Sequence, residues 1–170
     1  MKFFTSDQHY FHKNIISYCK RGFSDINKMH KTLIDAHNSA VSENDDVYHL
    51  GDFAMLKKDE ISKIGPILQK LNGIHHLILG NHDEGKPFTY IRMGFASVHT
   101  SLNVNEFFLV HDPAVAVIFN GMNQKILCGH VHQLTKWVND DILNVGVDVW
   151  NYKPLSIEFI RKQWGTRGYI

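Results

Sequence analysis

Imidazole, carboxylate and amide side chains recur in this sequence directly after short apolar runs. One such run, over residues 77–79, leads into Gly80-Asn81-His82-Asp83. An apolar run of this kind predicts the end of a buried strand, and a glycine lets the backbone turn sharply after it. A plain turn needs only one of Asn, Asp or Gly. We therefore interpret the three successive polar side chains as part of a shared chemical site.

Other apolar runs along the chain end in the same way. Sites in open α/β sheets form at the carboxyl ends of strands, so groups that are distant in sequence could converge there. Together the strand ends supply the following candidate ligands: Asp7, His9, Asp52, Asn81, His111, His130 and His132.

This set of side chains predicts a metal centre. It combines imidazoles, carboxylates and one amide oxygen without a thiolate, which suits manganese, iron or zinc better than a structural cysteine–zinc site. It also holds more ligands than one ion needs. Two ions about 3.5–4 Å apart that share a bridging carboxylate would use them all.

The elements that must position these groups alternate between strands and helices in the first half of the chain. We predict strands over residues 2–5, 47–50, 75–79, 95–98, 102–104, 106–110, 125–128 and 142–145. We predict helices over residues 12–19, 24–41, 57–71 and 156–164. The short strands from residue 95 to residue 110 favour an antiparallel second sheet. The whole pattern favours an α/β sandwich in one domain over residues 1–170.

Composition narrows the functional classes. The formal net charge is +1, from 18 Lys and Arg against 17 Asp and Glu, so we expect no broad basic face for extended nucleic acid. Cys19 and Cys128 form no CxxC pair and are interpreted as reduced thiols. The N-terminal residues do not resemble a signal peptide, and the apolar runs are too short to cross a bilayer. We therefore expect a cytoplasmic protein that does not bind membranes.

The order of the polar blocks resembles a known superfamily. Five blocks of the chain resemble, in order, the motifs of the calcineurin-like metallophosphoesterases: Asp7-Gln8-His9, Gly51-Asp52, Gly80-Asn81-His82-Asp83, His111 and Gly129-His130-Val131-His132. The segments 12–16 and 144–154 are similar to a small bacterial and phage branch of it. The resemblance spans residues 7–132. It implies a four-layer α-β-β-α sandwich of two mixed β-sheets flanked by helices.

The resemblance also implies which residues hold which ion. The first divalent ion would be held by Asp7, His9, Asp52 and His132. The second would be held by Asp52, Asn81, His111 and His130. Asp52 would bridge the two. Manganese is the first expectation for both ions, and iron, zinc or nickel are the alternatives.

The implied reaction is phosphoester hydrolysis. A hydroxide that bridges the two ions would attack the phosphorus of a phosphodiester or nucleotide-like substrate. His82 would donate a proton to the leaving group, and Asp83 would orient or charge-stabilise the His82 imidazole. Hydrolysis of a small phosphorylated metabolite, a phosphomonoester, is the alternative.

Some residues near these motifs have two interpretations. His12 and Asn14 could bind a substrate phosphate or cap the following helix. Arg21 could contact a phosphate or be a solvated surface charge, while Asp148 could support a ligand histidine or form a turn. The remaining histidines considered are interpreted as structural or packing residues: His30, His37, His49, His75, His76 and His99.

Departures from the superfamily pattern limit the classes of substrate that we expect. Phe53-Ala54 follows Gly51-Asp52 in place of the Asp-Arg-Gly of Ser/Thr phosphoprotein phosphatases, which disfavours a protein-phosphatase role. The chain is too short for a cap domain and has no arginine cluster to clamp a dianion, so the site favours diesters. Phe11 stands where the small branch would have glycine. A non-catalytic scaffold on the same fold is disfavoured because every ligand position is intact.

Overall fold

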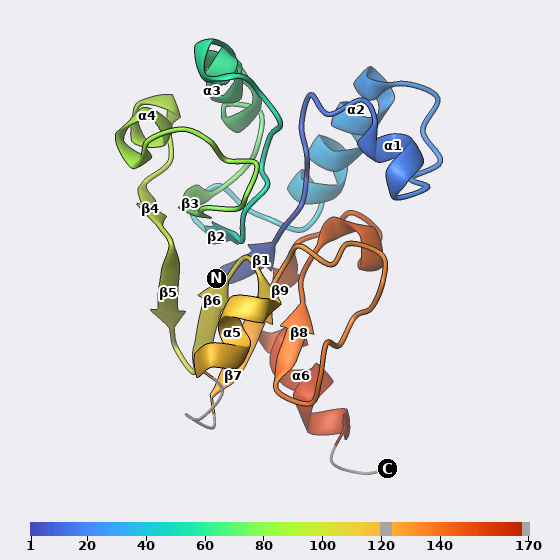
Figure 1. Cartoon of the computed structure of the whole chain (residues 1–170), viewed down its shortest axis with the longest axis vertical. Helices are drawn as coiled ribbons and strands as arrows, with labels where there is room; N and C mark the ends of the chain where they lie inside the picture. Colours follow the sequence, from blue (N-terminus) through green and yellow to red (C-terminus); the bar gives the residue numbers. More distant parts are fainter. Residues whose placement is uncertain (120–123, 168–170) are drawn as a thin grey trace.

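The protein folds around two β-sheets that lie against each other (Figure 1). A computed structural model describes residues 1–119 and 124–167. The predicted domain of residues 1–170 also includes 120–123 and 168–170, which lie outside the described residues. Within the described ranges, no helix is both long enough and apolar enough to cross a membrane.

The first sheet is the five-stranded one, with strand order β4-β3-β2-β1-β9. Its strands are β1 (Lys2–Thr5), β2 (Asp46–His49), β3 (Ile74–Ile78), β4 (Ser97–His99) and β9 (Leu155–Ser156). The first four are parallel to their neighbours, and β9 runs antiparallel to β1. The strands predicted over 2–5, 47–50 and 75–79 are confirmed within one residue at each end. The strand β9 was not predicted, because two residues are too few to give an alternating pattern.

The second sheet has four strands in the order β5-β6-β7-β8. They are β5 (Ser101–Val104), β6 (Phe107–Val110), β7 (Lys125–Cys128) and β8 (Ile142–Asn144). Only β5 and β6 pair antiparallel, whereas β6, β7 and β8 are parallel. The expectation of an antiparallel second sheet is therefore wrong beyond its first hairpin, and the strand predicted near residue 97 belongs to the first sheet. Long connections after β6 and β7 allow the parallel pairing, which a tight hairpin cannot make.

Helices flank the two sheets (Figure 1). They are α1 (Ile15–Tyr18), α2 (Ile26–Asn38), η1 (Lys58–Lys63), α3 (Ile64–Leu68), α4 (Pro87–Met93), α5 (Pro113–Phe119), η3 (Val147–Val149) and α6 (Ile157–Arg167). The helix α2 is shorter than predicted, because Asp25 caps it by accepting the Lys28 N–H at 2.9 Å. The helices α4 and α5 were not predicted. Each begins with proline, which fits the first turn of a helix, but seven residues are too few for a clear helical period.

Three apolar layers separate four layers of secondary structure. Met29, Leu33 and Ile64 pack the helices against the first sheet. A middle layer joins the two sheets through these buried residues: Phe4, Leu50, Ile78, Phe107, Leu109 and Leu127. Ala116 of α5 packs on Ile126 of β7, across the outer face of the second sheet. The predicted four-layer α-β-β-α sandwich of two mixed sheets is therefore confirmed.

The two sheets meet at the carboxyl ends of their parallel strands. Ser6, after β1, forms an isolated bridge with Gly146, after β8. A Cβ atom added at Gly129, after β7, would lie 1.9 Å from Ser6 Oγ. Only glycine allows this approach of the two backbones. The loops that carry the candidate ligands of both sheets are thus held against one another.

Candidate metal centre

Asp52 lies between two of the predicted histidine ligands. Its Oδ2 atom is 3.5 Å from His9 Nε2 and 3.5 Å from His111 Nε2. Its other oxygen, Oδ1, accepts the backbone N–H of His82 at 2.9 Å. The carboxylate is therefore fixed on one side by backbone and presents one oxygen to imidazoles from both sheets.

One group of ligand atoms lies on the His111 side of Asp52. Asn81 Oδ1 is 3.1 Å from His111 Nε2 and 3.0 Å from His130 Nδ1. The two imidazole nitrogens are 3.3 Å apart. These atoms converge as the second predicted ligand set requires.

Another group lies on the His9 side. Ligand atoms of Asp7, His9 and His132 all lie within 4.8 Å of one another, and His132 Nε2 is 4.0 Å from Asp7 Oδ1. Asp7, Asp52 and His111 form a further group that meets the same criterion. The structure thus brings together all the ligands predicted from sequence.

The residues fit a pair of divalent cations. His9 Nε2 is buried and has no hydrogen-bond partner among the described residues, although a buried polar atom normally has one. Ligand atoms that surround one ion at about 2.1 Å lie roughly 3–4 Å from each other. The separations of 3.0 to 4.0 Å agree with that spacing. A cation beside Asp52 would satisfy the otherwise unpartnered His9 nitrogen.

The backbone at the site is strained. Five of the candidate ligand residues have positive φ angles: Asp7 (60°), His9 (52°), Asp52 (52°), His130 (69°) and His132 (46°). Residues other than glycine rarely adopt this region, and such strain concentrates at functional sites. Phe11, where the sequence resemblance leads to an expectation of glycine, also has a positive φ of 67°.

Outer hydrogen bonds fix which nitrogen of two histidines faces the centre. His111 Nδ1 donates to the Leu50 carbonyl at 2.7 Å, which turns its Nε2 toward the centre. His132 Nδ1 donates to Asp148 Oδ2 at 3.0 Å, which likewise turns its Nε2 inward. Metal-binding histidines are commonly held in this manner. Asp148 therefore contacts a predicted ligand histidine, as one of its two interpretations expects.

The charges at the centre favour a cation. Burial lowers the pKa of His9 to about 2, so this imidazole is neutral. Burial would raise the pKa of Asp52, but the hydrogen bond with His111 prevails and lowers it to about 2. Burial opposes a charge on His111 too, yet its contact with Asp52 raises its pKa to about 9. Positive charge beside the Asp52 carboxylate is therefore stabilised.

Arg21 is not placed to contact a substrate. Its side chain is buried and binds the Asp148 carboxylate at 2.7 and 3.0 Å. It also donates to the backbone carbonyls of Asp7 and Gln8 at 2.7 and 2.9 Å. Both sequence interpretations of Arg21 are wrong, because partners far along the chain enclose its guanidinium group.

Asp83 does not orient the His82 imidazole. Its Oδ2 atom accepts the backbone N–H groups of Asp52 and Gly80 at 2.8 and 2.9 Å, and its Oδ1 accepts that of Phe53 at 3.2 Å. The predicted catalytic role is therefore corrected. The buried Asp83 carboxylate ties the loop after β2 to the loop after β3.

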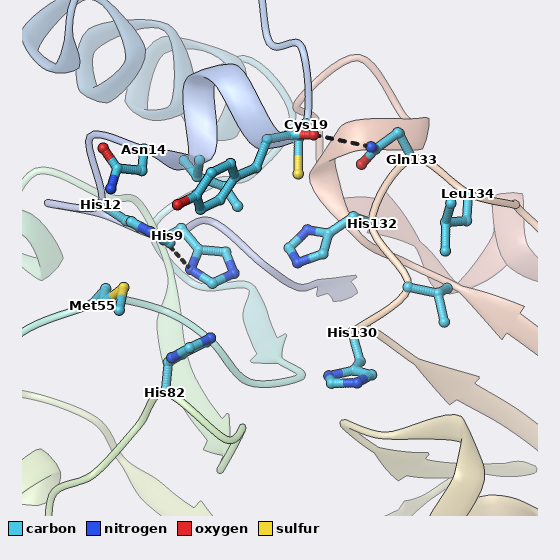
Figure 2. A pocket seen from close by; sticks show the side chains of 13 residues that line it. His9, His12, Asn14, Cys19, Met55, His82, His130, His132, Gln133 and Leu134 are labelled. Carbon is cyan, nitrogen blue, oxygen red and sulfur yellow. Dashed lines mark hydrogen bonds between the residues drawn. The ribbon is translucent and has the colours of Figure 1, made fainter.

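A cavity of about 470 Å³ opens over the ligands. Figure 2 shows the imidazoles of His9, His82, His130 and His132 around its interior. The His82 ring lies 5.4 Å from the His9 ring between centroids, and His12 Nδ1 is 3.2 Å from His9 Nδ1. Asn14 lines the cavity and precedes α1, but its side chain makes no capping hydrogen bond within the described residues.

Sequence reasoning missed Asn144, which shapes the loop of His132. Its Nδ2 donates to the carbonyls of His132 and Thr135 at 2.9 and 2.8 Å, and its Oδ1 accepts the Gly146 N–H at 2.7 Å. Asn144 is fully buried at the end of β8. Its position at a strand end is the signal that identified the other site residues.

Comparisons with known proteins concern the fold and the family. No family model matches the chain. The crystal structure of the protein of unknown function AQ665 from Aquifex aeolicus is similar, with a TM-score of 0.73 and 23% sequence identity over 96% of this chain and 98% of that chain. The sequence is 38% identical over 167 residues to the uncharacterized protein MJ1445 of Methanocaldococcus jannaschii. The aligned region covers 94% of this chain and 89% of that protein. The chain therefore belongs to the same protein family as MJ1445.

Proposed function

We propose that this protein is a metal-dependent phosphoesterase that hydrolyses a phosphodiester or nucleotide-like substrate. The observation that supports the proposal best is the position of Asp52 Oδ2, 3.5 Å from an imidazole nitrogen on either side. A carboxylate between two ligand groups is what a pair of cations requires. The resemblance of the ordered motifs to the calcineurin-like metallophosphoesterases supports the same reaction.

The two proposed metal cations would be held by these residues: Asp7, His9, Asp52, Asn81, His111, His130 and His132. When bound, two divalent cations supply a water of lowered pKa as the nucleophile and neutralise charge on the phosphate. Manganese is the first candidate, with iron, zinc and nickel as alternatives. The protein's own part is to hold Asp52 as an ionised carboxylate and to keep the histidine ligands in one tautomer.

His82 is the proposed proton donor to the leaving group. Its backbone N–H binds Asp52 Oδ1, which places its imidazole at the cavity without making it a ligand. His12, whose ring lies 6.2 Å from the His82 ring, and Asn14 are the proposed substrate contacts in the same cavity. They can donate hydrogen bonds to phosphate oxygens.

A monoanionic diester fits the cavity better than a dianionic monoester does. Among the described residues, the side chains that line it include histidines but no Lys, Arg, Asp or Glu. A second negative charge would therefore have no fixed cationic side chain to bind it. Hydrolysis of a small phosphomonoester is the alternative.

The test combines metal analysis with turnover of bis(p-nitrophenyl) phosphate. The protein is stripped with a chelator, reloaded with manganese, iron, zinc or nickel, and assayed. Asp52→Asn should lose both metal and turnover. His82→Ala should keep its metal and lose about 100-fold in turnover of a diester with a poor alkoxide leaving group, the usual contribution of a general acid.

His99→Ala is the matched control, because the His99 side chain bonds Ser97 on β4 and does not line the cavity. It should retain wild-type metal content and activity. Unchanged hydrolysis of a poor leaving group by His82→Ala would refute the acid role. Failure of the wild-type protein to bind any of these metals and to hydrolyse either ester class would refute the proposed function.

A further inference from the structure

The cavity over the candidate metal centre is lined by imidazoles and by apolar side chains. The imidazoles include those of His9 and His132. Apolar side chains from α1 and from the loop after β7, here called the apolar wall, also line it: Ile15, Tyr18, Val131 and Leu134. None of these four residues is a candidate ligand or takes part in the proposed reaction.

The apolar wall is open to solvent. Tyr18 is 65% exposed and Leu134 is 80% exposed. Large apolar side chains that cluster at a concave polar site mark a place where a ligand covers them. We therefore expect a bound substrate to cover the exposed side chains of this wall.

The two parts of the wall are tied together. Gln133 Nε2 donates to the Tyr18 carbonyl at 3.3 Å, which joins the loop after β7 to the end of α1. The Tyr18 ring lies 6.0 Å from the His12 ring, and the two planes are inclined at 79°. The wall is therefore a preformed surface that includes an aromatic ring next to a proposed substrate contact.

On the basis of the proposed phosphoesterase function, we propose that this wall binds an uncharged aromatic ring carried by the phosphodiester. The cavity volume of about 470 Å³ leaves room for a ring beside the phosphate, since small-molecule pockets begin at about 300 Å³. A charged group would find no fixed countercharge among the described residues that line it. An aromatic ring gains both burial and edge-to-face contact with Tyr18.

The ring belongs to the ester group that stays on the phosphate. His82 and Met55 lie on one side of the cavity and Leu134 lies on the other (Figure 2). The leaving group must face His82 to receive its proton. The second ester group is then directed toward Leu134 and the loop after β7.

The experiment uses two substrates with the same leaving group. Bis(p-nitrophenyl) phosphate carries an aromatic second group, and methyl p-nitrophenyl phosphate carries a methyl group in its place. The ratio of their kcat/KM values is measured for the manganese-loaded wild-type protein, Tyr18→Ala and Leu134→Ala. Intrinsic reactivity cancels when each variant's ratio is divided by the wild-type ratio.

We expect each variant to lower the ratio about fivefold, as the loss of one aromatic contact at Tyr18 or of one apolar contact at Leu134 predicts, while kcat/KM for the methyl ester stays unchanged. Phe88→Ala is the control, because Phe88 is 70% exposed on α4 and does not line the cavity. Its ratio should equal that of the wild type. An unchanged ratio in Tyr18→Ala and Leu134→Ala, or an equal fall for both esters, overturns the inference and leaves the phosphoesterase function standing. No turnover of either ester by the wild type overturns both.

Discussion

The Asp148 carboxylate joins three segments of the chain at the candidate metal centre. It receives two hydrogen bonds from Arg21, which is 127 positions away in sequence, and one from His132. Arg21 in turn binds the backbone of Asp7 and Gln8. The pair therefore positions the His132 imidazole and the Asp7 loop at once, from outside the set of ligands.

We predict that Asp148→Asn weakens manganese binding by about 10- to 100-fold, the usual effect of removing a group that supports a ligand. The amide cannot stabilise the His132 tautomer as a carboxylate does, and the Arg21 guanidinium loses its buried countercharge. Titration calorimetry with manganese measures the loss. Glu106→Gln is the control, because the exposed Arg161–Glu106 pair lies elsewhere on the surface and contributes about 1 kcal/mol or less. Equal manganese affinity in Asp148→Asn and wild type would contradict the positioning role.

At the scale of elements, β2 and β3 bury a chain of neutral histidines beneath the site. His75 Nε2 donates to the Leu71 carbonyl at 3.3 Å, so its Nδ1 accepts from His49 Nε2 at 3.1 Å. His49 Nδ1 then accepts from Gln8 Nε2 at 3.2 Å. The interpretation of His49 and His75 as structural residues is confirmed by these contacts.

This chain predicts a loss of stability in acid. Burial lowers the pKa of His75 from 6.5 to about 4, and burial places that of His49 well below its ordinary value. Between pH 6.5 and about 4 the unfolded chain binds more protons at His75 than the folded protein does. The free energy of unfolding therefore falls as the pH falls through this window, by on the order of 3 kcal/mol for His75.

Urea unfolding across that pH window measures the effect. His75→Gln should be less stable than wild type at neutral pH, because it disturbs the hydrogen bonds to His49 and Leu71. Its free energy of unfolding should nevertheless fall less steeply than that of the wild type as the pH is lowered. Tyr48→Phe on β2 is the control, because neither side chain titrates in this pH window. It should keep the wild-type slope of the free energy of unfolding against pH. An identical slope in His75→Gln would show that another group causes the acid sensitivity.

The elements that the sequence predicted well are the strands marked by apolar runs and the 13-residue helix α2. The parallel strands of the first sheet and the helix α2 carry clear apolar periodicity, whereas α4, α5 and β9 are too short for it. The candidate metal ligands were predictable because each follows a strand end. The partners of Arg21 and Asp83 were not, since a sequence does not indicate which backbone groups, 13 to 31 positions away, a buried charge will bind.

At the scale of the whole molecule, the candidate centre takes ligands from both sheets. Asp52 and Asn81 follow strands of the first sheet, and His111 and His130 follow strands of the second. A cation bound there would connect the two sheets and bind the folded state alone. Binding of the proposed metal would therefore raise the free energy of unfolding.

We predict that manganese at 100 times its dissociation constant stabilises the protein by about 2.7 kcal/mol. This corresponds to a rise in Tm of about 5–10 °C for a chain of this size. Differential scanning fluorimetry with manganese and with a chelator measures the shift. Asp52→Asn should show none, and a wild-type Tm that is indifferent to both additions would contradict a metal bridge between the sheets.

The contact between Ser6 and Gly129 has a consequence for how the protein matures. Asp7 and His130 are 123 positions apart, and the Asp7 carboxylate accepts the His130 N–H at 3.0 Å. A nascent chain presents the first candidate ligands long before the last, so the proposed ions would bind fully only after synthesis has passed residue 132. A protease cut between β4 and β5 would divide the candidate ligands between two fragments, and neither fragment alone would hold both ligand groups.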